Sequence, residues 1–146
     1  LVQFQHDLLL GKSVERLTEP YRAIMQLGGD QPLMQLQIAI QYAKAGLLDK
    51  SVTQLEELLR QAPQYVAAHV AMGNVYYLKR NYRRALDSYS VAERLSNDDA
   101  GVKVNVALSF YGLQQMADAN AKFREATALD NGMAKRYETF AKLLSN

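Results

Sequence analysis

The two histidines are the first candidates for catalysis or metal binding in this sequence, and neither has a partner at a useful spacing. His6 is next to Asp7, but adjacent residues on a helix point about 100° apart, and no second histidine follows at the spacing of a metal site. His69 is isolated as well, so the expected role of its ring is packing between helices. The sequence has no cysteine, which excludes a disulfide, a thiol nucleophile and a thiolate metal site. We therefore expect no enzyme activity, no metal and no cofactor.

Adjacent carboxylates do not form a pair suited to acid–base chemistry. Glu56 and Glu57 are neighbours only in sequence and indicate the polar face of a helix, whereas Asp98 and Asp99 indicate a turn or a helix start. The glycine pair at 28–29 lacks the following Lys-Ser or Lys-Thr of a phosphate-binding loop. These residues give no reason to expect catalysis.

Four basic residues lie close together in the middle of the chain: Lys79, Arg80, Arg83 and Arg84. Such a cluster could meet phosphates or an acidic partner. The alternative, which we favour, is a solvated turn between two helices whose charge is offset by Asp87 and Glu93. The formal net charge of the chain is only +2, so we expect no nucleic-acid partner.

Small side chains recur at a step of 34 residues, at Ala39, Gly73, Ala107 and Ala141. Other columns keep this step: an aromatic or apolar column of Tyr42, Tyr76, Phe110 and Leu144, a second small column of Ser51, Ala85 and Ala119, and a bulky column of Leu55, Tyr89 and Phe123. Spacings of three or four within a group place its members on one helical face. The period predicts stacked helical hairpins in which small residues let two helices approach closely.

The residues in these columns resemble the tetratricopeptide repeat family, whose helix-turn-helix unit has the same period. The best match is the segment 68–97, in which Met72-Gly73, Tyr76, Tyr82, Ala85, Tyr89 and Ala92 fall where the family places Leu-Gly, Tyr, Tyr, Ala, an aromatic residue and Ala. The position where the family usually has tryptophan holds Gln35, His69, Lys103 and Tyr137. The resemblance implies an all-α fold, a right-handed α-solenoid of such hairpins.

We expect residues 1–146 to form one domain with three full repeats, at 32–65, 66–99 and 100–133. Residues 134–146 are predicted to form one capping helix that lies on the last repeat, because a repeat stack must shield its terminal apolar faces. Residues 1–31 are predicted to form a degenerate hairpin. Their apolar residues, among them Phe4, Leu8 and Leu17, approximate the columns, while Pro20 interrupts the second helix.

The first helix of each repeat is apolar over most of its circumference, and such a helix is seldom left facing water. In the tetratricopeptide family the first helices line a concave groove, so the resemblance places these residues where a ligand would lie: Leu36, Ile40, Val70, Asn74, Tyr77, Val104, Asn105, Leu108 and Tyr111. One interpretation is that they pack between neighbouring first helices and are mostly covered. We favour the other, a largely apolar groove with Tyr77 and Tyr111 as aromatic anchors and Asn74 and Asn105 as hydrogen-bond partners of a ligand backbone.

A subset of the family binds the carboxylate terminus of chaperone tails through a clamp of lysine, asparagine and arginine. Asn74, Asn105 and Lys135 fall on three of its positions, but Val70 and Thr139 replace a lysine and an arginine. Because charge-assisted hydrogen bonds are the strong ones, we expect carboxylate capture to be poor.

The expected function is therefore a protein–protein interaction module or scaffold that binds a peptide or an amphipathic helix, with no catalytic role. The alternative is a self-associating structural element that docks its groove or an end hairpin on another copy. No apolar stretch approaches the roughly 18 residues of a membrane span, so we expect none. Localisation is left open between cytoplasm and periplasm for a soluble chain, and the start at Leu1 indicates a fragment or a processed form.

Overall fold

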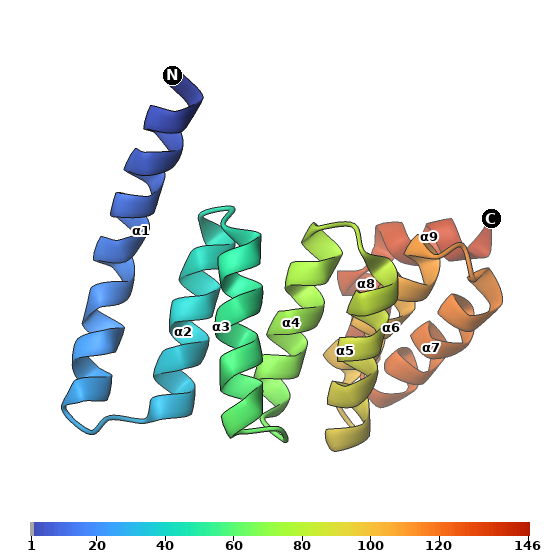
Figure 1. Ribbon diagram of the computed structural model, residues 1–146. Coiled ribbons are helices and arrows are strands. Elements are labelled where there is room, and N and C mark those ends of the chain that lie inside the picture. The colour runs from blue at the N-terminus through green and yellow to red at the C-terminus, as the bar shows by residue number, and fades with distance from the viewer. Residues whose placement is uncertain (1) are drawn as a thin grey trace. The chain divides into compact units, whose positions relative to one another are not determined.

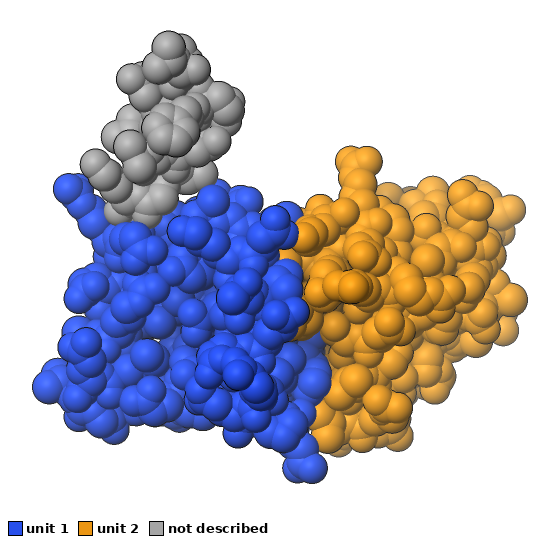
Figure 2. Space-filling model, viewed as in Figure 1, with its two compact units in different colours: residues 1–71 blue, residues 72–146 orange. Residues whose placement is uncertain are grey.

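The computed structural model describes the backbone of residues 2–146 and the side chains of residues 14–146. This part of the chain is helical and contains no strand, which confirms the all-α prediction (Figure 1). The chain divides into two compact units: unit 1 comprises residues 1–71 and unit 2 comprises residues 72–146 (Figure 2). His6, Phe4 and Leu8 belong to the residues whose side chains are not described.

Six helices follow the three predicted repeats in pairs. They are α2 (Gln31–Lys44) with α3 (Leu48–Gln61), α4 (Val66–Leu78) with α5 (Tyr82–Leu95), and α6 (Ala100–Gly112) with α7 (Met116–Leu129). Asp30 and Asp99 cap α2 and α6 by accepting the amide hydrogens of Leu33 and Val102. The boundary between the two units falls within α4.

The turn inside each repeat has one geometry that recurs at the repeat step. Gly46, Arg80 and Gln114 all have positive φ, of 80°, 60° and 62°. In each turn the next backbone amide donates to the carbonyl oxygen of the residue in the aromatic column. Leu47 donates to Tyr42 at 2.9 Å, and the amides of residues 81 and 115 donate in the same way to the carbonyls of residues 76 and 110. This is a Schellman motif, in which a left-handed residue ends the helix and satisfies its last carbonyls.

The small columns allow close helix contact in both units. In unit 2, a Cβ atom added to Gly73 would lie 2.5 Å from the ring of Tyr89, so only glycine fits against that ring. In unit 1 the equivalent positions hold Ala39 and Leu55, and both are fully buried. The Ser51 hydroxyl also donates to the Ala39 carbonyl at 2.8 Å, which places the two small columns against each other, as the sequence indicated.

A single helix replaces the hairpin predicted over 1–31. Helix α1 (Val2–Gln26) runs through Pro20 without reversing. Proline removes one amide donor from a helix but does not by itself reverse the chain, and the helix ends at Gln26, just before Gly28 with its φ of 84°. The prediction of a hairpin here was wrong.

A polar cluster, which we call the Tyr42 hub, fixes α1 to α2 within unit 1. Arg22 donates to the Tyr42 hydroxyl at 2.8 Å and pairs with Glu15 at 3.0 Å, and the Tyr42 hydroxyl donates to Glu15 at 3.2 Å. Arg22 also donates to Thr18, whose side chain is completely buried. Val14 and Ile38 add buried apolar contact beside the hub.

An ion cluster joins three helices of unit 2. Lys103 on α6 lies 3.0 Å from Glu93 on α5, and Lys122 on α7 lies 3.1 Å from the other oxygen of Glu93. Glu125 completes the cluster at 2.9 Å from Lys122. The Lys103 side chain is only 6% exposed, so its charge depends on these carboxylates.

The C-terminal segment forms two short helices in place of the one that was predicted over 134–146. They are α8 (Gly132–Arg136) and α9 (Glu138–Ser145), separated at Tyr137, whose ψ of 40° leaves the helical region. The break lets both Met133 and Phe140 reach the apolar cluster of unit 2. The ring of Phe140 packs edge to face on Tyr111 and Phe123, at centroid distances of 5.6 and 5.4 Å.

Candidate functional site

The predicted groove residues differ in how much of their surface a ligand could reach. Leu36 is 6% exposed and Val104 is completely buried in the core of unit 2, so the prediction that these two side chains bind a ligand was wrong. Sequence periodicity gives the face of a helix on which a residue lies, but not the depth of packing over it. Ile40 and Val70 of unit 1 are half-buried.

Four of the predicted residues come together at one place in unit 2. Asn74 and Tyr77 on α4 and Asn105 and Leu108 on α6 line a hollow of about 260 Å³. Leu78 and Tyr89 complete its lining, and the sequence analysis did not include either of them in the site. We call this set of six residues the Asn74 hollow.

The polar side of the Asn74 hollow is built from neutral groups. The Tyr89 hydroxyl donates to the side-chain oxygen of Asn74 at 2.5 Å. Burial of Tyr89, with a smaller contribution from Tyr77, raises the pKa of its hydroxyl far above the ordinary value, so the group stays a neutral donor at all ordinary pH values. This bond orients Asn74 and leaves its amide hydrogens available. The side-chain amide of Asn105 has no hydrogen-bond partner among the described residues.

The aromatic side of the hollow is supported by contact between two tyrosine rings. Tyr77 packs edge to face on Tyr82 at a centroid distance of 5.2 Å, and Tyr82 lies against Gly112, where an added Cβ would be 2.5 Å from the ring. Burial, and then the neighbouring Tyr82, raise the pKa of Tyr77. Tyr77 therefore presents a supported, neutral ring at the edge of the hollow.

Tyr111, the second aromatic anchor in the prediction, lies outside this hollow. Its ring packs on Phe140 and it is half-buried at the edge of the apolar cluster of unit 2. It therefore contributes more to the attachment of α9 than to the lining of the Asn74 hollow.

No histidine or carboxylate side chain is among the residues that line the Asn74 hollow. The His69 ring, on α4, bonds to the carbonyl oxygen of Pro63 at 2.7 Å, which ties this helix to the preceding loop in unit 1. No cluster of three or more histidine and carboxylate side chains suited to a metal ion occurs in the part of the chain with described side chains. Amide and phenol groups beside apolar walls are suited to hydrogen bonds with a peptide backbone.

The basic cluster is partly engaged in the fold of unit 2. Arg84 donates to the Tyr76 hydroxyl at 3.0 Å and lies over the Tyr76 ring at 5.4 Å. Arg80 occupies the left-handed turn position. These roles agree with the interpretation of the cluster as a solvated turn.

The remaining clamp positions lie away from the Asn74 hollow. Lys135 and Thr139 are exposed on the C-terminal segment and are not part of its lining. Because the hollow has no cationic side chain among its lining residues, it provides no charge-assisted bond for a terminal carboxylate.

Solved structures of tetratricopeptide proteins resemble this chain in fold. MamA from Desulfovibrio magneticus is 19% identical, with a TM-score of 0.72 over 98% of this chain and 86% of that one. A thermophilic TPR protein of Thermus thermophilus is 20% identical, with a TM-score of 0.70 over 97% and 80% of the two chains. The first TPR of Spaghetti (RPAP3), bound to an HSP90 peptide, is 13% identical, with a TM-score of 0.71 over 80% and 94%.

No family model matches the sequence, and the search of curated proteins found no match. The structural likeness establishes that the chain has a tetratricopeptide-type fold. None of the helices in the described part is long and apolar enough to cross a membrane.

Proposed function

We propose that the chain is a protein-interaction scaffold and that the Asn74 hollow of unit 2 binds a peptide segment of a partner. The observation that carries the proposal is the meeting of two side-chain amides with Tyr77 and Leu108 in one hollow. Amides at Asn74 and Asn105 would bond to the backbone of the segment, and one of its apolar side chains would pack between Tyr77 and Leu108. The peptide-bound TPR of Spaghetti supports a binding role for this fold.

A binding role also agrees with the energetics of a small apolar surface. A segment that buries about 500 Å² of apolar area gains roughly 12 kcal/mol at 25 cal/mol per Å². Association and ordering cost about 4 to 15 kcal/mol. We therefore expect dissociation constants in the micromolar range, as is suitable for a reversible scaffold.

The test begins with selection of peptides from a random display library on the purified protein. The affinity of the selected peptides is then measured by calorimetry for the wild type and for variants. We expect Tyr77→Ala to weaken binding about 30-fold, because truncating a central aromatic anchor costs about 2 kcal/mol. Asn105→Leu should weaken it about fivefold through loss of a hydrogen bond worth about 1 kcal/mol.

Asn131→Leu is the matched control, since Asn131 is an exposed asparagine of unit 2 outside the hollow. Selected peptides that bind Tyr77→Ala and Asn105→Leu as tightly as the wild type would disprove the proposal. Sedimentation velocity over a concentration series tests self-association. A dimer that dissociates in Tyr77→Ala would identify a second copy of the chain as the occupant instead.

A further inference from the structure

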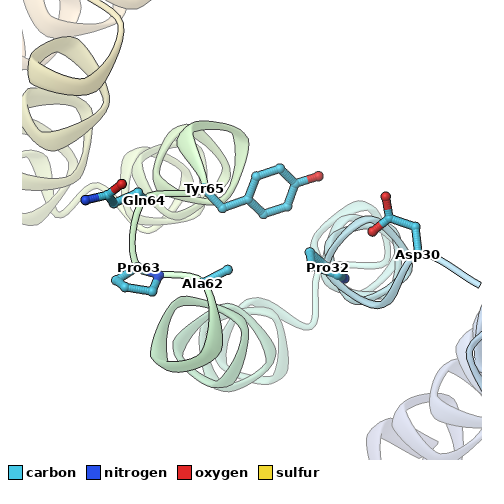
Figure 3. Close-up of a pocket in the computed structure, with 6 residues that line it drawn as sticks. All are labelled: Asp30, Pro32, Ala62, Pro63, Gln64 and Tyr65. Atoms are coloured by element: carbon cyan, nitrogen blue, oxygen red, sulfur yellow. The ribbon is translucent and has the colours of Figure 1, made fainter.

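A larger hollow lies in unit 1, away from every residue that the sequence analysis placed in a site. It has a volume of about 490 Å³ and is lined by the start of α2 and by the loop between α3 and α4, with Asp30, Pro32, Ala62, Pro63, Gln64 and Tyr65 around it. Figure 3 shows the Tyr65 ring extending toward Asp30 and Pro32 across this space. We call it the Asp30 hollow.

The walls are rigid and mostly apolar. Two proline rings cannot change their backbone φ, and the loop that carries Pro63 is held by its hydrogen bond to His69. The backbone amide of Tyr65 donates to the Ala62 carbonyl at 3.1 Å, which holds the backbone of the loop that carries this ring. A flat surface of this kind, in place before any ligand arrives, reduces the ordering cost of binding.

Asp30 is the single charged group of the lining, and one of its oxygens is already used. Oδ1 accepts the amide hydrogen of Leu33 at 3.1 Å as the cap of α2. The Asp30 charge contributes, after burial, to a raised pKa of Tyr65, which places the carboxylate within electrostatic reach of the phenol. Asp30 and Tyr65 both line the hollow, and the Tyr65 ring points toward Asp30 (Figure 3).

The partial charges at the helix ends change the electrostatic potential in the Asp30 hollow but do not make it positive. The starts of α2 and α4 each carry about half a positive charge, and the end of α3 carries about half a negative charge. Together with the full negative charge of Asp30, the sum is about half a negative charge. The hollow is thus suited to a cation.

We propose that the Asp30 hollow binds an arginine side chain of a partner peptide. A guanidinium group is planar and weakly hydrated, so it stacks on a tyrosine ring and against proline while it donates to a carboxylate. An ammonium group is a compact, strongly hydrated charge and gains less from flat apolar walls. The site belongs to unit 1 and does not depend on the Asn74 hollow.

The test uses a capped Gly-Arg-Gly peptide as the probe and backbone NMR shifts of the whole chain as the readout. We expect saturating shifts at Ala62, Gln64 and Tyr65 with a millimolar dissociation constant. The same peptide with citrulline, which is uncharged and of the same shape, should bind about tenfold more weakly. The lysine peptide should also bind more weakly than the arginine peptide.

Asp30→Asn gives a sharp variant, because asparagine caps a helix as well as aspartate does and the fold is retained. It should weaken the arginine peptide about tenfold. Asp99→Asn, which changes the equivalent cap of α6 in unit 2, is the matched control and should leave the affinity unchanged. Tyr77→Ala should also leave it unchanged, which separates this proposal from the one on the Asn74 hollow.

Three results would overturn the proposal. The arginine peptide could shift residues throughout the chain without saturation, its affinity could be the same in Asp30→Asn, or the citrulline or lysine peptide could bind as tightly as the arginine peptide.

Discussion

Unit 1 and unit 2 share one helical register but fill it with different chemistry. In unit 1 a tyrosine hydroxyl, Tyr42, is the centre of the polar hub, whereas the ion cluster of unit 2 is built around the charged, buried Lys103 with its carboxylates. Unit 1 has Ala39 and Leu55 at the positions where unit 2 has Gly73 packed against Tyr89. The period fixes where helices meet, and the side chains at those places decide how each unit is stabilised and what its hollow presents.

The largest difference in stability between variants of the two units should appear when one carboxylate of the ion cluster is removed. Glu93→Leu leaves the buried Lys103 with the distant carboxylate of Glu125, at 3.8 Å, and the neutral side-chain oxygen of Asn97, at 3.4 Å. We expect the free energy of unfolding, measured by urea denaturation, to fall by about 3 kcal/mol. Tyr42→Phe in unit 1 should cost only about 1 kcal/mol, because Arg22 keeps its pair with Glu15.

The double variant Glu93→Leu/Lys103→Met serves as the control for this prediction. It removes both buried charges and should recover most of the lost stability. Equal losses in Glu93→Leu and Tyr42→Phe would show that the two units do not differ in this way.

The glycine–tyrosine contact of unit 2 gives the next largest effect. Gly73→Ala places a Cβ within 2.5 Å of the Tyr89 ring and should destabilise the chain by about 2 kcal/mol through overpacking. Adding Tyr89→Leu copies the Ala39 and Leu55 pair of unit 1 and should recover stability in the same urea experiment. If Gly73→Ala is neutral, the ring of Tyr89 is not held as closely as the structure shows.

A substitution in the turns should have a smaller effect on stability, and it should raise stability where the preceding substitutions lower it. Unit 1 has Gly46 at the left-handed position, while unit 2 has Arg80 and Gln114 there. Gln114→Gly should raise the melting temperature, with a gain of about 1 kcal/mol, because glycine has no Cβ to strain at positive φ. Gln115→Gly, at the next residue with φ of −92°, should bring no gain.

The smallest expected effect is a loss of stability at low pH, which arises from the ion cluster of unit 2. The hydrogen bond from Lys122 lowers the pKa of Glu125 below its ordinary value of 4.5, against the opposing effect of burial. The stability from this pair is therefore fully present above about pH 4.5 and is lost as the pH falls through the lowered pKa. Because Glu125 is half exposed, we expect a loss of only a few tenths of a kcal/mol.

Glu125→Gln should flatten the acid limb of the stability curve, measured by urea denaturation between pH 6 and pH 3. An unchanged acid limb in this variant would assign the loss to other carboxylates.

Much of the fold could be predicted because the helix contacts repeat at a fixed step. The small and bulky columns located the three helix pairs even where the turn residue, as at Arg80 and Gln114, gives no local turn signal. Helix α1 could not be predicted in this way. Its position depends on hydrogen bonds between Arg22 and Tyr42, which are far apart in sequence, and Pro20 was given too much weight as a helix breaker.

The composition of the Asn74 hollow was predictable in part for a related reason. Asn74, Tyr77, Asn105 and Leu108 lie together because the register brings equivalent positions of successive first helices to one surface. Tyr89 was missed because the sequence assigned it only to the bulky column of the core. Its hydroxyl reaches beyond that core to Asn74, which a column of side-chain sizes does not reveal.

The Schellman turns constrain how the length of this chain can change. Residues 47, 81 and 115 each satisfy the end of one helix and directly precede the start of the next. An insertion of one residue there would separate the end of the first helix from the start of the second and misalign the two helices of the hairpin. Length variation should therefore be tolerated better in the connections at 62–65 and 96–99, where the backbone hydrogen bonds within each loop can be rebuilt without shifting a helix pair.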